Sequence, residues 1–308
     1  QFNESETIDN EALLDDVLER VALPSKFASS NNADESSFDV IAIYSNIAFV
    51  DMVKNLVCNF YTINIERYII FSLDARLCSA LRIIDAPCYF DARFGTGVDD
   101  IQFWTIDANS TYVQLMVMKM NYVNQVLKAG YNILLIDADI VLLEDVRVVL
   151  AEQYGQFDLV LQSDARVNDE STNDWVCAGF FYMKSNARTI AFMDEVERVM
   201  MEVGVNDQDA MQLLLSGHGQ KFVFPANLRY QSADELGLRW TTLDAQHWPN
   251  GDAMFDSMTA VDAPKMAHAN MRPLKRKKKD LAKHQLWFLN DDADGCDIVS
   301  NNRLTVAP

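Results

Sequence analysis

One segment near the middle of the chain limits the folds open to it more than any other. Residues 133–143 (ILLIDADIVLL) are apolar except for two aspartates, Asp137 and Asp139. Apolar runs of this kind form central strands that are buried on both faces of an α/β sheet. We therefore predict a buried strand at residues 132–136, with both aspartates directly after its carboxyl end.

The spacing of the two aspartates suggests a metal site. Asp137 and Asp139 are two residues apart, so an extended chain directs both carboxylates to the same side. In open α/β sheets, ligands bind beyond the carboxyl ends of such strands. Two carboxylates this close repel each other unless a cation lies between them. A hard divalent ion, Mg²⁺ or Mn²⁺, is the expected occupant, and it would bridge the carboxylates to a diphosphate.

The remaining apolar patterns also predict an α/β fold. A strand, a helix and a second strand open the folded part, which is typical of parallel pairing. Helical spacing predicts helices over residues 47–60, 112–128, 189–202 and 207–216. Short apolar runs predict further strands at residues 38–44, 68–73, 159–162, 179–184 and 221–224. Beyond residue 231 the chain shows no regular pattern, and we expect irregular structure there.

The ends of the chain differ from its middle. Residues 1–37 are acidic and rich in Ser and Asn, with one amphipathic stretch that ends at Pro24. We predict a short helix and a loose linker there. One folded domain is expected at residues 38–290, followed by a tail at residues 291–308.

Charge and hydropathy argue against nucleic-acid binding and against a membrane-spanning segment. The net charge of −19 and the pI near 4.5 argue against nucleic-acid binding, which needs a basic surface. No run of 18 apolar residues occurs, so we expect no membrane segment in the chain as given. The start at Gln1 and the N-glycosylation sequons at Asn3 and Asn109 favour a secretory-pathway protein, in the Golgi lumen, whose anchor has been trimmed. Cys78 and Cys88 are spaced so that they could form a disulfide.

Two other interpretations of the acidic motifs compete with the metal site. Residues 137–141 (DADIV) fit the nucleophile motif of haloacid-dehalogenase-type phosphatases, in which Asp137 would attack phosphorus. That motif normally opens its domain, whereas a long α/β stretch precedes it here. Residues 290–295 (NDDADG) have the spacing of a calcium-binding loop, but Asn301 stands where such a loop has Glu.

A series of short motifs along the chain narrows the choice. They are Lys119, Gly130-Tyr131, residues 135–143, 162–164 (QSD), 178–185 (AGFFYMKS), Asp207-Gln208, 249–251 (PNG), 268–270 (HAN) and Leu286-Trp287. In this order they resemble the nucleotide-diphospho-sugar transferase family that includes plant cell-wall xylosyl- and arabinosyltransferases. The resemblance implies the GT-A fold, a single Rossmann-like domain with a mixed, mostly parallel sheet flanked by helices. It also implies a metal-dependent, retaining glycosyltransferase.

The resemblance assigns roles to the metal and sugar ends of the site. It implies that Asp139 binds the metal directly, that Asp137 contacts the metal, its water or the donor ribose, and that His268 completes the metal site. A mixed carboxylate and imidazole set suits Mn²⁺. It also implies that Asp207, Gln208 and Asp164 point into the sugar pocket and act as the catalytic residues.

The donor would be a nucleoside-diphosphate sugar, most simply a UDP-sugar, and the acceptor a glycan or glycoprotein. Asp137, Lys119, Gly179 and Gly251 would contact the donor. We expect the basic run at residues 275–279 to be a flexible segment that closes over the diphosphate, with Lys275 as the phosphate contact. The aromatic residues Trp240, Trp248 and Phe255 are candidates for an acceptor platform.

The sequence departs from the family at two places. Ala178 stands where many members carry Asn, and residues 271–274 (MRPL) replace a glycine-containing stretch. The first departure affects the turn that would contact the sugar. The second affects which lysine would bind phosphate.

Overall fold

The computed structural model describes residues 11–26, 38–91, 111–166, 169–220, 222–256, 261, 263–290, 292–293 and 295–297. Every candidate site residue named above lies within these ranges. The sequons at Asn3 and Asn109 lie outside them, as do Asp291, Asp294 and Asn301 of the alternative calcium-binding loop.

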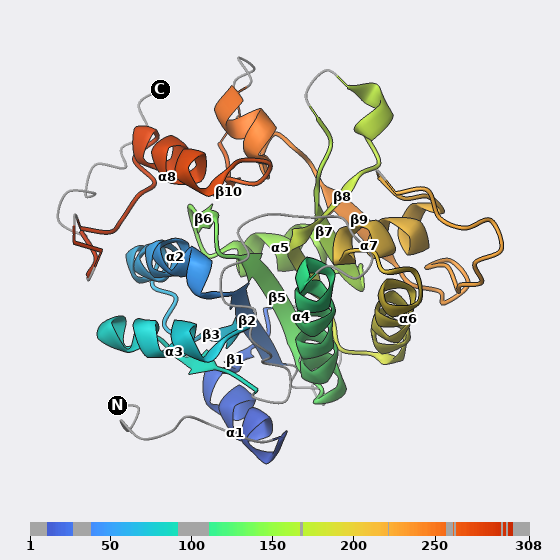
Figure 1. The fold of residues 1–308 in the computed structure, drawn as a ribbon, viewed down its shortest axis with the longest axis horizontal. Helices are drawn as coiled ribbons and strands as arrows, with labels where there is room; N and C mark the ends of the chain where they lie inside the picture. Colours follow the sequence, from blue (N-terminus) through green and yellow to red (C-terminus); the bar gives the residue numbers. More distant parts are fainter. Residues whose placement is uncertain are drawn as a thin grey trace.

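A mixed, mostly parallel sheet runs through the centre of the molecule (Figure 1). Its strands are β1 (Leu23–Pro24), β2 (Phe38–Ser45), β3 (Ile69–Ser72), β4 (Cys88–Tyr89), β5 (Asn132–Asp137), β7 (Leu159–Ser163), β8 (Val176–Met183) and β9 (Trp240–Leu243). They lie in the order β4-β3-β2-β5-β8-β7-β9, and β1 pairs with β2. β8 is antiparallel to β5 and β7, and the other neighbours in this order are parallel.

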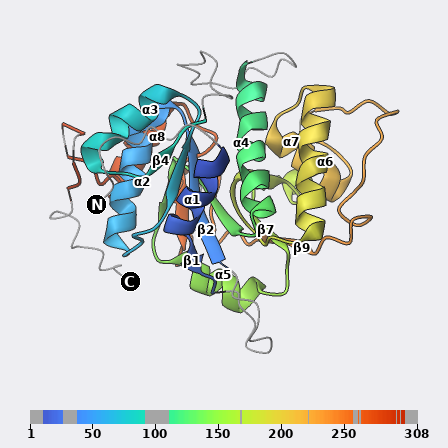
Figure 2. The same cartoon turned by 90° about the horizontal axis from the view of Figure 1, so that it is seen from below.

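Helices cover both faces of the sheet (Figures 1 and 2). One layer contains α1 (Glu11–Val21), α4 (Thr111–Lys128), α6 (Ala187–Val203) and α7 (Asp207–Ser216). The other contains α2 (Val50–Thr62), α3 (Ala75–Leu81), α5 (Val146–Tyr154) and α8 (Leu274–Lys283). In β5, Ile133 and Leu135 pack on the first layer, whereas Leu134 and Ile136 pack on the second. This alternation explains the continuous apolar run, because both faces of the strand are buried. The α/β class and the GT-A arrangement predicted from the sequence are confirmed.

A small second sheet brings a late part of the chain to the end of β5. β6 (Ile140–Leu142) pairs antiparallel with β10 (Met266–His268), with His268 opposite Ile140. The backbone N–H of Ala269 donates to the carbonyl oxygen of Asp139 at 3.0 Å. This pairing fixes His268 beside the aspartates although it lies far from them in the sequence.

One disulfide and a buried helix tie the ends of the described chain to the core, and a second disulfide links α3 to β4. Cys78 bonds to Cys88, and Cys58 in α2 bonds to Cys296. Leu14 and Leu18 of α1 are buried in the first helical layer.

Among the described helices, none is long and apolar enough to cross a membrane.

Three expectations from the sequence are wrong. No strand forms at residues 222–224, where Phe222 and Phe224 pack against the first layer without strand pairing. The region beyond residue 231 contains β9, β10 and α8, of which the strands are too short to show a periodic pattern. The basic run at residues 275–279 is the body of α8 and not a flexible segment, because Lys and Arg are good helix formers.

The expectation that Trp248 forms part of an acceptor platform is also wrong. This side chain is 1% exposed and packs against Phe180, with ring centroids 5.6 Å apart. It belongs to the core and cannot present a face to a sugar.

Candidate active site

A cavity of about 410 Å³ opens beyond the carboxyl ends of β2 and β5. Residues 44–46 line one part of the wall, and the first residues of α7, residues 271–273 and Lys277 of α8 line others. The sequence-predicted site residues in its wall are Lys119, Asp137, Asp139, Asp164, Gly179, Asp207, Gln208 and His268. The fold therefore brings eight of the ten predicted residues to one cavity, and Gly251 and Lys275 lie outside its lining.

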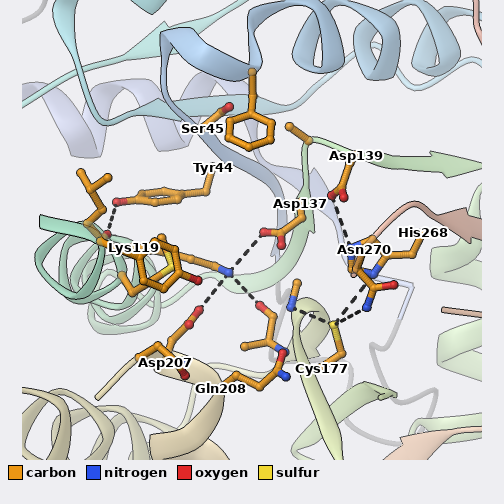
Figure 3. Close-up of a pocket in the computed structure, with 18 of the residues that line it drawn as sticks. Tyr44, Ser45, Lys119, Asp137, Asp139, Cys177, Asp207, Gln208, His268 and Asn270 are labelled. Atoms are coloured by element: carbon orange, nitrogen blue, oxygen red, sulfur yellow. Dashed lines mark hydrogen bonds and ion pairs between the residues drawn. The ribbon is translucent and has the colours of Figure 1, made fainter. Parts of the chain in front are cut away.

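Asp137, Asp139 and His268 form a cluster that can hold a metal ion (Figure 3). Each offers one ligand atom, and these atoms all lie within 4.8 Å of one another. Nε2 of His268 lies 3.3 Å from Oδ1 of Asp139, and its other ring nitrogen lies 2.6 Å from Oε1 of Gln162. Two carboxylates and an imidazole are a donor set that fits Mn²⁺ or Mg²⁺, and Mn²⁺ in particular.

The two aspartates have different electrostatic surroundings. Burial raises the pKa of Asp137, and the neighbouring Asp139 adds to this effect, although Lys119 opposes it. Burial would also raise the pKa of Asp139, but Lys277 and His268 outweigh it and hold that pKa well below its usual range. Asp139 is therefore the more firmly ionised carboxylate of the pair.

Lys119 of α4 links the aspartate pair to the start of α7 (Figure 3). Its Nζ lies 3.2 Å from Oδ1 of Asp137 and 3.0 Å from Oδ2 of Asp207, and it donates to the carbonyl oxygen of Ala178 at 2.9 Å. Burial would lower the pKa of Lys119, but the two carboxylates raise it well above its usual range. Lys119 thus hydrogen-bonds to Asp137 and Ala178 and forms an ion pair with Asp207.

Amide side chains hold Asp164 in the wall of the cavity. Gln208 donates from Nε2 to Oδ2 of Asp164 at 3.1 Å, and Asn270 donates to its Oδ1 at 3.0 Å. Oε1 of Gln208 accepts from the backbone N–H of Ala178 at 3.2 Å, and its Nε2 also donates to Gln220 at 2.8 Å. Both polar atoms of Gln208 are thus engaged with the protein, which fixes the direction of its side chain.

The two predicted glycines have different positions. Gly179 lies in β8 beside a break in the pairing of β7 with β8, between Leu161 and Gln162. Gly251 lies behind the site, where its backbone N–H donates to Oδ1 of Asn270 at 2.6 Å. A Cβ at Gly251 would lie 2.4 Å from the carbonyl oxygen of Asn270 and 2.5 Å from Nη1 of Arg272, so Gly251 can influence the cavity through these two lining residues.

The structure places Lys277, and not Lys275, in the cavity. Lys275 is exposed, whereas Lys277 lines the cavity and donates to Oδ2 of Asp139. Leu274, Lys277 and Leu281 recur at helical spacing, so they share the inward face of α8. This spacing in the sequence is compatible with a helix whose inward face carries Lys277, whereas the density of charge favoured a flexible segment. Gln162 and Asn270 lay within recognised motifs, but nothing in the sequence showed their contacts.

Comparisons with known proteins agree with this architecture. The chain matches the nucleotide-diphospho-sugar transferase family over residues 63–281. It is 28% identical to the UDP-galactose:fucoside alpha-3-galactosyltransferase of Dictyostelium discoideum, over 85% of this chain and 45% of the relative. It is 23% identical to the beta-arabinofuranosyltransferase RAY1 of Arabidopsis thaliana, over 71% of this chain and 40% of the relative.

The chain thus spans less than half the length of either curated relative. Among solved structures, galactosyltransferase LgtC in complex with donor and acceptor sugar analogues is similar at a TM-score of 0.45 and 12% identity, over 80% of this chain and 93% of that one. This likeness is too distant to support conclusions about activity. The family match, in contrast, covers most of the sheet and most of the cavity residues. The chain belongs to the nucleotide-diphospho-sugar transferase family.

Proposed function

We propose that this protein transfers a sugar from a nucleoside-diphosphate donor to a glycan or glycoprotein acceptor, and that transfer needs Mn²⁺ or Mg²⁺. The observation that carries the metal dependence is the convergence of Asp137, Asp139 and His268 in one cavity. A UDP-sugar is the favoured donor, because one relative is named for its use of UDP-galactose.

At the metal end, the residues favour a diphosphate clamp. A bound divalent ion would neutralise the diphosphate and stabilise it as a leaving group. Asp139, Asp137 and His268 would hold that ion. Lys277 already contacts Asp139, so its ammonium is close enough to this end to take over the phosphate contact that the sequence suggested for Lys275. Lys119 keeps Asp137 in place through their ion pair.

At the sugar end, two carboxylates are held in fixed positions. Asp207 is paired with Lys119, and Asp164 accepts hydrogen bonds from Gln208 and Asn270. Glycosyl transfer develops positive charge at the anomeric carbon, which fixed carboxylates stabilise. We propose that Asp164 and Asp207 supply this stabilisation, that Gln208 orients Asp164, and that the anomeric configuration is retained.

The compartment is proposed on chemical grounds. Disulfides persist in oxidising compartments, and the described chain contains two of them. Both curated relatives are glycosyltransferases by name. These observations support a place in the secretory pathway, in the Golgi lumen. The phosphohydrolase alternative gains no support, because the family match falls on sugar transferases.

The test is donor turnover by the Asp139→Asn variant. UDP release from a panel of UDP-sugars, beginning with UDP-galactose, is measured with Mn²⁺ and with EDTA. We expect turnover in wild-type protein only with the metal, and a loss of at least about 100-fold in the variant, because a divalent ion supplies several kcal/mol of charge stabilisation. Asp244→Asn, at an exposed carboxylate outside the cavity, is the matched control and should keep full activity. Metal-independent turnover by Asp139→Asn, with its fold intact, would refute the proposal.

A further inference from the structure

His268 is oriented from behind by one buried side chain, that of Gln162 in β7. Gln162 is 0% exposed, and its Oε1 lies 2.6 Å from Nδ1 of His268. Its Nε2 donates to the backbone carbonyl oxygens of Trp248 at 3.2 Å and Pro249 at 3.0 Å. Gln162 thus joins β7 to the ring of His268 and to the segment before Gly251.

The two backbone contacts decide which way the amide of Gln162 points. A carbonyl oxygen can only accept a hydrogen bond, so the two carbonyls of Trp248 and Pro249 both require N–H donors. The amide nitrogen has two such donors, and both are used there. The amide oxygen must therefore face His268, where it too can only accept.

An acceptor at 2.6 Å requires that Nδ1 of His268 carries the proton. The sulfur of Cys177 is the other neighbour of Nδ1, but it lies 3.8 Å away and is a weak hydrogen-bonding group. In the neutral ring the lone pair then lies on Nε2, which faces Oδ1 of Asp139 at 3.3 Å. Two acceptors that face each other at this distance are favourable partners for a shared cation.

We propose that Gln162 is a positioning residue, which holds His268 in the Nδ1–H tautomer so that Nε2 is ready to bind the divalent ion. The opposite tautomer would place a proton on Nε2, where Asp139 would accept it, and that hydrogen bond would compete with the metal. This inference rests on the metal dependence proposed above. Groups behind a metal ligand act in this way when they fix the tautomer and orientation of the ring.

The first test observes the tautomer without any metal. ¹⁵N-labelled histidine is incorporated, and long-range ¹H–¹⁵N spectra of the metal-free protein are recorded at alkaline pH, where imidazole side chains are neutral. Wild-type His268 should be the Nδ1–H tautomer, and Gln162→Met should convert it to Nε2–H. Gln212→Met is the matched control, because Gln212 is equally buried but bonds to Val176 and Asp174 instead. It should leave His268 unchanged.

The second test measures the dissociation constant for Mn²⁺ by calorimetry. Gln162→Met should weaken Mn²⁺ binding by about 10–100-fold, the usual cost of losing such a supporting group, and Gln212→Met should not. The tautomer of His268 in wild-type protein keeps the inference testable even if the methionine variant fails to fold.

Two results would overturn the inference. One is an Nε2–H tautomer in wild-type protein, and the other is unchanged Mn²⁺ affinity in a folded Gln162→Met variant. Wild-type protein that shows the expected tautomers but binds no Mn²⁺ would instead refute the metal-dependent function and leave the control of the tautomer by Gln162 standing.

Discussion

At Gly179, the site has room for a hydrogen atom and nothing larger. A Cβ at this position would lie 2.5 Å from Oδ2 of Asp137 and 2.8 Å from Cε1 of His268. Both atoms belong to residues that are held by other contacts, namely the ion pair with Lys119 and the hydrogen bond with Gln162. The absence of a side chain here allows the carboxylate and the imidazole to approach the same point.

Gly179→Ala is therefore expected to damage activity more than stability. Displacement of Asp137 or His268 should lower donor turnover by up to about 100-fold, the cost of a misplacement of about 1 Å in an active site. Turnover and melting temperature are measured side by side. Gly295→Ala is the control, because its Cβ would meet only Nδ2 of Asn290, at 3.6 Å. Full activity in Gly179→Ala would show that the cluster is not tightly constrained.

At the residue scale, the sequence predicted the groups that carry charge better than the groups that orient them. Asp137 and Asp139 were found because they interrupt an apolar strand, and His268 because its motif follows the others in order. Gln162 could not be assigned, because its partners Trp248 and Pro249 lie more than 80 residues away and are contacted through backbone atoms. Asn270 and Gly251 likewise depend on a contact between separate segments.

At the scale of elements, α8 is the most informative, because one helix carries both the predicted and the observed phosphate candidates. Lys277 faces the cavity and binds Asp139, whereas Lys275 is exposed. The ammonium of Lys277 and a divalent ion would compete for the same carboxylate, so removal of this charge has two opposite effects on ligand binding.

Lys277→Gln should bind Mn²⁺ more tightly and UDP more weakly than wild-type protein. The first effect follows from the loss of a competing cation, and the second from the loss of a positive charge near the diphosphate. Calorimetry measures both affinities, and Lys275→Gln, with the same change of charge on the same helix, should match wild type in each. Equal effects of the two substitutions would mean that only the general charge of α8 matters.

Elements with strong periodicity were predicted well, and short ones were missed. The helix at residues 207–216 matches α7, and α4 differs from its prediction only at its first residue. β10 has three residues and depends on pairing with β6, so no local pattern could reveal it. α8 was not predicted as a helix, because its inward face carries few apolar residues and Leu281 is its one buried residue.

At the scale of the whole molecule, one buried carboxylate joins three distant segments. Asp158, which is 0% exposed and precedes β7, accepts paired hydrogen bonds from Arg188 at 2.8 and 3.1 Å and from Arg239 at 3.1 and 3.2 Å. Burial would raise the pKa of Asp158, but the bonds from the two arginines outweigh it and hold that pKa well below its usual range.

This arrangement predicts how stability depends on pH. A depressed pKa stabilises the fold above the unfolded-state pKa of about 4, and this contribution is lost as the pH falls below that value. Asp158→Asn should therefore lower the free energy of unfolding by about 1.5–3 kcal/mol near pH 7, the range for hydrogen bonds to charged groups. Urea unfolding at neutral and at acid pH should show the difference shrinking below about pH 4. A difference that does not change with pH would contradict the assignment.

The site as a whole exists only in the folded chain. Its wall combines residues 44–46 at the end of β2, residues 137–139 at the end of β5, the start of α7, and residues 271–273 with Lys277 of α8. The carboxyl ends of β2 and β5 meet at one edge of the sheet, as the parallel strands predicted, and the pairing of β6 with β10 adds His268 (Figure 1). The order of the motifs predicted that these segments share a site, but only the fold shows that Lys119 connects its two ends.

The central claim is that Asp137, Asp139 and His268 clamp a divalent ion to the donor diphosphate. Calorimetric titration of UDP into the protein, with Mn²⁺ and then with EDTA, tests it most directly. We expect saturable UDP binding with Mn²⁺, loss of that binding in EDTA, and no recovery by Mn²⁺ in Asp139→Asn. UDP binding that is equally tight in EDTA and in Mn²⁺ would contradict the claim.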